Sequence, residues 1–207
     1  INYVSENKPD YYNNLDKTYN KIWKLLEIGL SNRNDPFHLP AFICSNQNSV
    51  SGKIVVLRGV NKENKNLWFH TDVRSNKIKI LKKNPSASFL FYNKSEKVQL
   101  RVSANIIINY KNNFTNQSWK KTAHMSRQCY LGEISPGTEA LEPTSGLTDD
   151  IDNSKYTIEE SEVGYKNFCI IEGKIKSIEW LYLASKGHRR AIFILNKDNI
   201  DKKWLIP

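Results

Sequence analysis

The chain has 207 residues, of which 39% are hydrophobic and 25% charged, a composition typical of one globular domain rather than of a disordered chain. Its net charge of +10 suggests a nucleic-acid ligand, but the basic residues are scattered and no helix-turn-helix, zinc-finger or ribonucleoprotein motif accompanies them. We therefore expect solvated lysines and a small anionic ligand, with no nucleic-acid binding and no membrane-spanning segment.

Apolar residues between 13 and 33 recur at intervals of three and four, which predicts an amphipathic helix of about five turns. Asp35-Pro36 ends this helix, because the residue before a proline resists helical geometry. The next expected elements are strands at 39–44, 53–60 and 67–71, a polar turn at 45–52, a hairpin loop at 61–66 and a short helix at 75–83 that ends at Asn84-Pro85.

The rest of the chain predicts further strands around a long irregular region. In order, these are strands at 87–92 and 98–110, a helix at 114–123, a turn or helix at 126–131, a loop or mobile flap at 133–166, and strands at 168–175, 178–183 and 190–195. About seven strands and three or four helices are typical of a largely antiparallel barrel with peripheral helices. We divide the chain into an N-terminal helix and arm, 1–34, and a barrel domain, 35–207, with a flexible insertion at about 133–166.

The turn from His70 to Lys77 is a candidate phosphate site. Ser75 stands where a helix N-cap belongs, and the free backbone N–H groups of a helix start attract an anion. Lys77 adds a full positive charge nearby. The simpler alternative is that Ser75 only caps its helix and that Lys77 is a solvated surface residue.

Two other strands carry polar residues that could serve a ligand. Gln99 and Arg101 share one face of their strand, which could be ordinary surface, or could meet a flavin pyrimidine edge or an intersubunit ion pair. Lys53 and Arg58 are five residues apart and would lie on opposite faces of a regular strand, so they would serve different partners unless one lies past its end. Arg58 is the better candidate for a phosphate or carboxylate, although both charges could simply flank a buried strand.

Basic and aromatic residues crowd together near the C-terminus, at Trp180, Tyr182, Lys186, His188, Arg189 and Arg190. Packing like charges into one turn is costly, and an anionic ligand would relieve the repulsion. Trp180 could stack on a ring, or it could belong to the core or to an interface.

The cysteines and histidines indicate neither a disulfide framework nor a metal site. Cys44, Cys129 and Cys169 are widely spaced and odd in number, which favours a reducing, cytoplasmic compartment. The four histidines show no paired ligand spacing with one another or with a cysteine.

Five motifs in this order resemble the pyridoxamine 5′-phosphate oxidase family of FMN-binding split barrels. They are Lys-x-Val-Val-Leu-Arg at 53–58, Phe-His-Thr-x-x-x-Ser-x-Lys at 69–77, Asn84-Pro85, Val-Gln-x-Arg-Val at 98–102, and Trp180 followed by His188-x-Arg190. The run Ser126-Arg127-x-Cys129-Tyr130-Leu131 adds to this likeness. The resemblance covers roughly residues 35–207.

The resemblance implies a homodimer with FMN in the cleft between the subunits. The phosphate and ribityl chain would be held by Lys53, Val55, Val56, Arg58, His70, Thr71, Ser75, Asn76 and Lys77. Gln99 would address the isoalloxazine ring, while Trp180 and Arg190 would come from the opposite subunit; the pattern can also be slid from Trp180 to Leu181 or Tyr182. Asn76 replaces a usual arginine, which removes one charge from the phosphate site.

For the substrate, the resemblance implies a site made by Arg58, Arg127, Lys186 and His188. The implied reaction is hydride transfer from the substrate C4′ to flavin N5, with reoxidation by dioxygen and release of hydrogen peroxide. Ala123 and Leu131 replace a tyrosine and a serine of the family near Arg127, and an expected glutamine is missing from the loop that follows. We expect an oxidase of the pyridoxamine or pyridoxine 5′-phosphate type; the alternatives are an FMN-dependent reductase that uses a nicotinamide cofactor and a flavin-binding protein without turnover.

Overall fold

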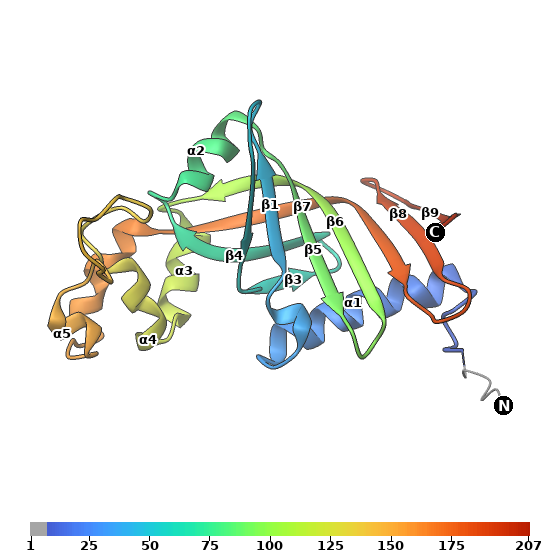
Figure 1. The fold of residues 1–207 in the computed structure, drawn as a ribbon, viewed down its shortest axis with the longest axis horizontal. Coiled ribbons are helices and arrows are strands. Elements are labelled where there is room, and N and C mark those ends of the chain that lie inside the picture. Colours follow the sequence, from blue (N-terminus) through green and yellow to red (C-terminus); the bar gives the residue numbers. More distant parts are fainter. Residues whose placement is uncertain (1–7) are drawn as a thin grey trace.

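The fold, a computed structural model that describes residues 8–207, is built on one curved antiparallel sheet (Figure 1). Its strands are β1 (Ala41–Ser45), β2 (Val50–Ile54), β3 (Gly59–Asn61), β4 (Asn66–Asp72), β5 (Ser86–Asn93), β6 (Val98–Asn109), β7 (Phe168–Tyr182), β8 (Arg189–Leu195) and β9 (Ile200–Leu205). The main path runs β2-β1-β5-β6-β7-β4-β3, and β8 joins β7 to β9. Every pairing is antiparallel, as the sequence predicts.

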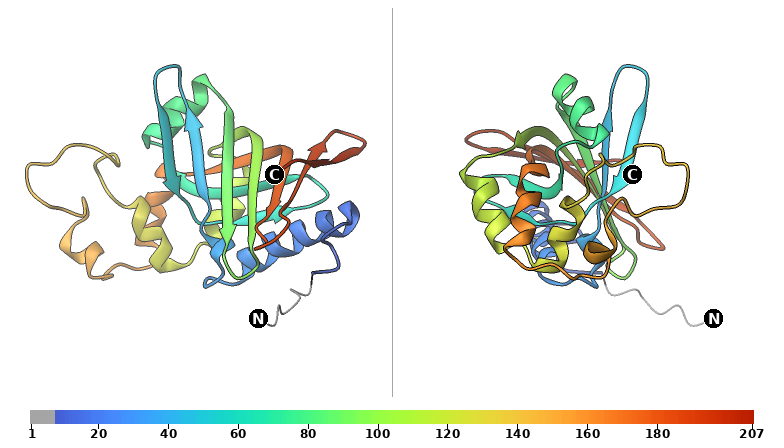
Figure 2. Two further views of the ribbon diagram at one scale, coloured as in Figure 1. Left: turned by 45° about the vertical axis from the view of Figure 1, so that its right-hand side comes forward. Right: turned by 90° about the vertical axis from the view of Figure 1, so that its left-hand side faces the viewer.

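The helices lie in two groups. The helical elements are α1 (Leu15–Ser31), η1 (Pro36–His38), α2 (Asn76–Lys83), α3 (Asn113–Lys121), α4 (His124–Arg127), η2 (Gln128–Tyr130), α5 (Asp149–Asp152) and η3 (Glu160–Asn167). Helix α1 runs along one side of the sheet, whereas α3, α4 and α5 gather at the far end (Figures 1 and 2). Within residues 8–207, none of the helices has the length and apolar character that a bilayer crossing requires.

Helix α1 forms where its apolar spacing predicts it. The Asn14 side chain caps its start by accepting a hydrogen bond from the Lys17 N–H (2.9 Å). Its buried face packs on the sheet, and Gly29 permits the following chain to come close. A Cβ atom at Gly29 would lie 2.6 Å from the Cβ of Phe37, so only glycine fits at this contact.

Alternation along β6 and β7 separates core from surface. Leu100 and Trp180 are paired across the two strands and both face the core, where Trp180 is 1% exposed. Its indole packs edge-to-face against Tyr11, with ring centroids 5.5 Å apart. Gln99 and Arg101 lie on the opposite face, as predicted.

The prediction of one strand over residues 53–60 is wrong. This segment contains the end of β2, an extended crossing stretch and the start of β3. In the crossing stretch the Val55 N–H donates to the Pro40 carbonyl (3.0 Å), whereas the Arg58 N–H donates to the Trp68 carbonyl (2.9 Å). The chain thus leaves β1 and joins β4, which removes the strand geometry that separated Lys53 from Arg58.

Two further differences concern the C-terminal strands. The strands predicted at 168–175 and 178–183 form the single strand β7, whose register shifts opposite Ser103 and Ala104 so that Lys176 bulges out of the pairing. The tail carries an additional strand, β9, at Ile200–Leu205, which pairs with β8. The irregular region at 133–166 also contains α5 and most of η3.

Candidate functional site

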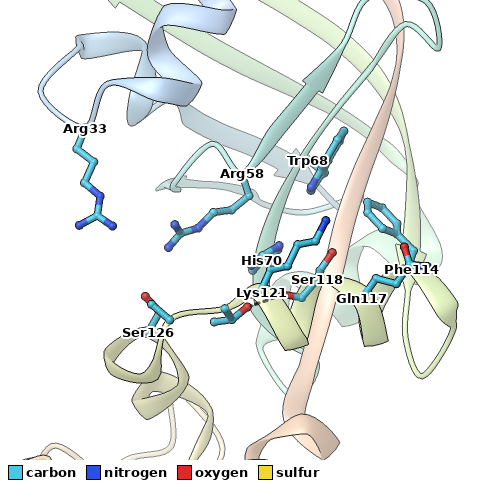
Figure 3. A pocket seen from close by; sticks show the side chains of 11 residues that line it. Arg33, Arg58, Trp68, His70, Phe114, Gln117, Ser118, Lys121 and Ser126 are labelled. Carbon is cyan, nitrogen blue, oxygen red and sulfur yellow. Dashed lines mark hydrogen bonds between the residues drawn. The ribbon is translucent and has the colours of Figure 1, made fainter. Parts of the chain in front are cut away.

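Two adjoining cavities lie between the edge of β4 and helices α3 and α4. The first, which we call the lysine cavity, has a volume of about 350 Å³ and is lined in part by Lys53, Thr71 and Lys77. The second, the tryptophan cavity, has a volume of about 430 Å³ and is lined in part by Trp68 and Phe114 (Figure 3). Arg58 and His70 line both, so the two cavities meet at these side chains.

Lys77 is the most informative residue of the lysine cavity. It is only 7% exposed, and its Nζ donates hydrogen bonds to Thr71 Oγ1 (2.8 Å) and Ser75 Oγ (3.2 Å). Burial, followed by the nearby charge of Lys53, lowers the pKa of Lys77. Among the residues that the structure describes, neither lysine forms an ion pair with a carboxylate. Because Lys53, Arg58 and Lys77 outnumber the one carboxylate of the lining, Asp72, the cavity offers a net positive charge to an anion.

The start of α2 lies next to this end of the cavity, which Lys77 alone of that helix lines. Ser75 occupies the N-cap position, as predicted, but its side chain makes no capping hydrogen bond and instead accepts one from Lys77. The simpler reading, a mere cap beside a solvated lysine, is therefore wrong. Asn76, predicted to contact the phosphate, is exposed and does not line the lysine cavity.

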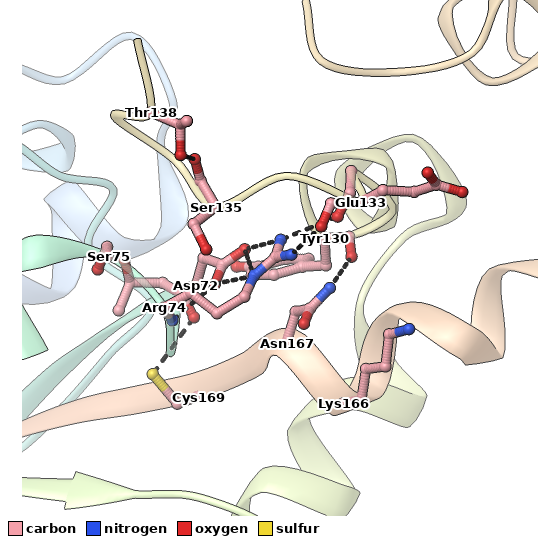
Figure 4. Close-up of polar contacts among 12 residues, drawn as sticks. Asp72, Arg74, Ser75, Tyr130, Glu133, Ser135, Thr138, Lys166, Asn167 and Cys169 are labelled. Carbon is pink, nitrogen blue, oxygen red and sulfur yellow. Dashed lines mark hydrogen bonds and ion pairs between the residues drawn. The ribbon is translucent and has the colours of Figure 1, made fainter.

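Asp72 lies at the same cavity and offsets only part of its positive charge. Its carboxylate is held by Arg74 Nη2 at 2.7 Å, and the same guanidinium donates to the carbonyls of Gly132 and Glu133, both at 3.0 Å (Figure 4). Arg74 thus neutralises Asp72 and attaches the start of the 133–166 segment to the turn before α2. The cationic character of the cavity is preserved.

His70 lies at the junction of the two cavities. Its ring packs edge-to-face against Phe168, with centroids 4.8 Å apart. Burial, and secondarily the charge of Arg58, lowers the pKa of His70 to about 4. His70 is therefore a neutral hydrogen-bonding group at physiological pH.

The depressed pKa of His70 predicts loss of stability in acid. Between pH 6.5 and 4 the His70 side chain is protonated in the unfolded chain and neutral in the folded chain. Lowering the pH from about 7.5 to 5 should therefore reduce the free energy of unfolding by about 2 kcal/mol through this residue. Urea unfolding at both pH values measures the change. His70→Gln should remove this contribution and the exposed control His188→Gln should keep it; equal pH dependence in both variants would refute the assignment.

A second group of predicted residues lies elsewhere, on the outer face of the sheet. The register places Gln99 opposite Leu181, and Leu181 opposite Arg190. Beside this row, Glu179 forms ion pairs with Arg190 (2.9 Å) and Arg101 (2.5 Å). None of these residues lines the lysine or the tryptophan cavity.

The expectation that Trp180 reaches a flavin is not supported, because its indole is enclosed in the core of its own subunit. Side chains alternate along β7, so Leu181 is the residue that shares a face with Gln99 and Arg190. Of the alternatives left open by the sequence, the register favours Leu181.

Lys186 and His188 are exposed in the turn between β7 and β8, away from both cavities. The N-terminal segment holds this turn: the Tyr12 hydroxyl donates to the Gly187 carbonyl. The Arg189 guanidinium stacks on the Tyr12 ring at 4.1 Å from its centroid. Contacts within the subunit therefore fix the position of this turn, but they do not bring it to either cavity.

Arg127 is also absent from both cavities, contrary to its expected role at the substrate. It is 3% exposed and pairs with Glu162 at 2.5 Å. Its other donors bind the carbonyls of Trp119 (3.0 Å) and Thr122 (3.2 Å), and it stacks on the Trp119 ring. The guanidinium is fully used in joining α3, α4 and η3.

Sequence reasoning missed several residues of the cavities. Cys129 and Tyr130 line the lysine cavity, and Arg33, Trp68 and Lys121 line the tryptophan cavity. Cys129 and Tyr130 belong to a quoted motif and could have been included on that ground. The other three come from separate elements whose meeting no local pattern reveals.

The comparisons with known proteins agree with this geometry. Residues 23–109 match the family described as "Pyridoxamine 5'-phosphate oxidase, FMN-binding domain". The matched segment contains Lys53, Arg58, Thr71 and Lys77 and so includes one wall of the lysine cavity. Among curated proteins, none matches this sequence.

Two solved structures resemble the whole chain. A pyridoxamine 5′-phosphate oxidase-related, FMN-binding protein from Nostoc punctiforme PCC 73102 has a TM-score of 0.73 and 15% identity over 98% of this chain and 100% of that one. PhzG from Burkholderia lata 383, solved in complex with tetrahydrophenazine-1-carboxylic acid, has a TM-score of 0.71 and 16% identity over 100% of both chains. These likenesses confirm the predicted split-barrel fold.

Proposed function

Residues 23–109 belong to the FMN-binding domain family of pyridoxamine 5′-phosphate oxidase, and on that premise we propose that this chain is an FMN-dependent oxidoreductase. The observation that carries the proposal is Lys77, a buried ammonium group beside Lys53 without a carboxylate partner in the described part of the chain. A phosphate monoester supplies the missing negative charge and accepts hydrogen bonds from both lysines.

The donor set of the lysine cavity fits the phosphate end of FMN. Lys53, Thr71 and Lys77 would hold the phosphate, helped by the start of α2, while the chain at Val55 and Val56 would run beside the ribityl group. When bound, FMN would supply the capacity to accept a hydride. The protein would hold the cofactor in position. Neutral His70 and cationic Arg58 lie where the lysine cavity meets the tryptophan cavity, beside the bound cofactor.

We further propose a homodimer, because the remaining predicted flavin contacts lie on a different surface of the subunit. Gln99, Leu181 and Arg190 share the outer face of the sheet, and a second copy could bring them to the flavin ring. The same face exposes Ile54 (65%) and Tyr92 (51%), which dimerisation would remove from water. Solution scattering of a single protomer would contradict this part of the proposal.

The favoured activity is that of an oxidase acting on pyridoxamine or pyridoxine 5′-phosphate or a related small anion, with dioxygen as the final acceptor. A reductase that uses a nicotinamide cofactor and a flavin-binding protein without turnover remain the alternatives. No nucleic acid or membrane is required by this function.

Freshly purified protein is expected to be yellow and to show a flavin absorption spectrum. Under nitrogen, pyridoxine 5′-phosphate should bleach it, and readmitted air should restore the colour with release of peroxide. Bleaching by a nicotinamide cofactor alone would favour the reductase, and no bleaching by either would favour a binding protein. A colourless protein that does not take up added FMN would reject all three.

We also propose that the protein works in the cytoplasm. The three cysteines are free in the described chain; Cys44 and Cys169 are buried, whereas Cys129 is exposed at the lysine cavity. A reducing compartment keeps such an accessible thiol in its reduced form.

A further inference from the structure

We propose that Lys77 is a reactive amine: when the lysine cavity holds no flavin, its Nζ condenses with a small phosphorylated aldehyde to form an imine, and the modified protein no longer takes up FMN. The ligand class is a carbonyl compound that carries a phosphate. The imine chemistry depends on the lysine cavity alone, whereas the competition with FMN rests on the proposed function.

Lys77 differs from the other lysines of residues 8–207 in its burial, since it alone among them is buried. Burial, followed by the charge of Lys53, lowers the pKa of Lys77, because both disfavour the charged form of the amine. Asp72 acts in the opposite direction, but its influence is the smallest, and its carboxylate is held by Arg74 at 2.7 Å. A desolvated lysine beside a second cation is the arrangement that makes an amine nucleophilic.

The nitrogen of Lys77 has room for one more partner. It donates to Thr71 Oγ1 at 2.8 Å and to Ser75 Oγ at 3.2 Å, and it makes no other hydrogen bond within residues 8–207. A lysine nitrogen has three positions for partners, so one stays open, and the side chain lines the lysine cavity. The two hydroxyls hold Nζ in place and lie close enough to pass protons to and from it during a reaction.

The rest of the lysine cavity suits a phosphate attached to a small aldehyde. Its volume of about 350 Å³ lies at the lower end of the range of small-molecule sites. Lys53 and Arg58 line it, and within residues 8–207 neither forms an ion pair. A phosphate bound to these cations would hold the aldehyde group beside Nζ, which raises the rate of their reaction. An aldehyde without a phosphate lacks this anchor.

The reaction is a condensation in which nothing is oxidised or reduced. Nζ of the neutral amine forms a bond to the carbonyl carbon, and the double bond between that carbon and its oxygen breaks. The oxygen leaves as water with the two protons of the amine, so the products are one imine and one water molecule and no other reactant is needed. The imine and its phosphate then occupy the groups, Lys53 and Lys77, that the phosphate of FMN would require.

The test labels the flavin-free and the FMN-loaded protein with 4-formylphenyl phosphate, and with 4-methoxybenzaldehyde as the uncharged control. Cyanoborohydride reduces each imine to a stable amine, and peptide mass spectrometry measures the labelling rate of each lysine. In the flavin-free protein we expect Lys77 to be labelled at least about tenfold faster than Lys79, an exposed lysine of the same helix. The phosphate should speed labelling of Lys77 by about tenfold over the uncharged aldehyde, and bound FMN should slow it by at least about tenfold.

Two variants check the assignment. Lys77→Met should lose the fast labelling, whereas Lys79→Met should keep it, and thermal unfolding verifies that both are folded. The peptide map of the wild-type protein identifies the modified lysine by itself, so the result does not depend on the folding of a variant.

Fast labelling of Lys77 that the phosphate enhances and that FMN prevents supports the inference. Equal rates at Lys77 and Lys79, equal rates with the two aldehydes, or a labelled protein that still binds FMN overturns it. A wild-type protein that takes up no FMN rejects the proposed function instead, and the comparison of Lys77 with Lys79 then still decides whether Lys77 is a reactive amine.

Discussion

Replacing Lys77 by methionine should lower the affinity for FMN by roughly ten- to a hundredfold, the value of a charge-assisted hydrogen bond. Lys77 donates from a buried position to Thr71 and Ser75 and shares its cavity with Lys53. A phosphate bound there would be removed from bulk water. Water could therefore not take the place of the missing ammonium group without a loss of binding free energy.

The same substitution should leave the flavin-free protein as stable as the wild type or stabilise it. Methionine has a similar length, and it removes a buried charge whose ionised form is already disfavoured by burial and by Lys53. Fluorescence titration with FMN and thermal unfolding without it measure the two effects. Lys79→Met, at an exposed position of the same helix, is the matched control. A large loss of stability in Lys77→Met, or equal FMN affinities in both variants, would show that Lys77 is structural.

Replacing Arg127 by methionine should destabilise the fold by about 3 kcal/mol and lower Tm by roughly 6–12 °C. The guanidinium fills a site with 3% exposure and satisfies the carbonyls of Trp119 and Thr122. Methionine would leave these acceptors without donors inside the packing of α3, α4 and η3.

Two further substitutions distinguish this structural role from binding of a substrate. Arg127→Lys should recover only part of the stability, because an ammonium group cannot reach all the acceptors of a planar guanidinium. Glu162→Gln should cost much less, since that side chain is 56% exposed. Thermal unfolding ranks the variants. An Arg127→Met protein of wild-type stability with a raised KM would instead restore the substrate role that the family resemblance implies.

The sequence predicts the elements of this fold well where one face of a regular segment is buried. Helix α1 and the two faces of β6 follow directly from apolar spacing. The break between β2 and β3 was missed because the residues from 53 to 60 stay extended and apolar while their hydrogen-bond partners change. Strand β7 was divided in two because the bulged Lys176 interrupts its alternation without ending its pairing.

The candidate site was predictable only in its local part. A strand end followed by a serine and a lysine at a helix start indicates an anion site, and the structure does gather Thr71, Ser75 and Lys77 there. Which side chain of β7 accompanies Gln99 depends on the register between distant strands, which spacing along one strand does not specify. The burial of Arg127 depends on η3, thirty or more residues away, and no motif around Arg127 reports that contact.

The contact between Gly59 and Trp68 limits the size of the residue that position 59 can carry. A methyl group at 59 would occupy the place of the indole, with 1.9 Å to Cζ2, so a residue larger than glycine at 59 requires the side chain at 68 to be smaller or to move. We therefore expect Gly59→Ala to displace the Trp68 indole from its place on β3 and so to disturb the wall that Trp68 forms with Phe114.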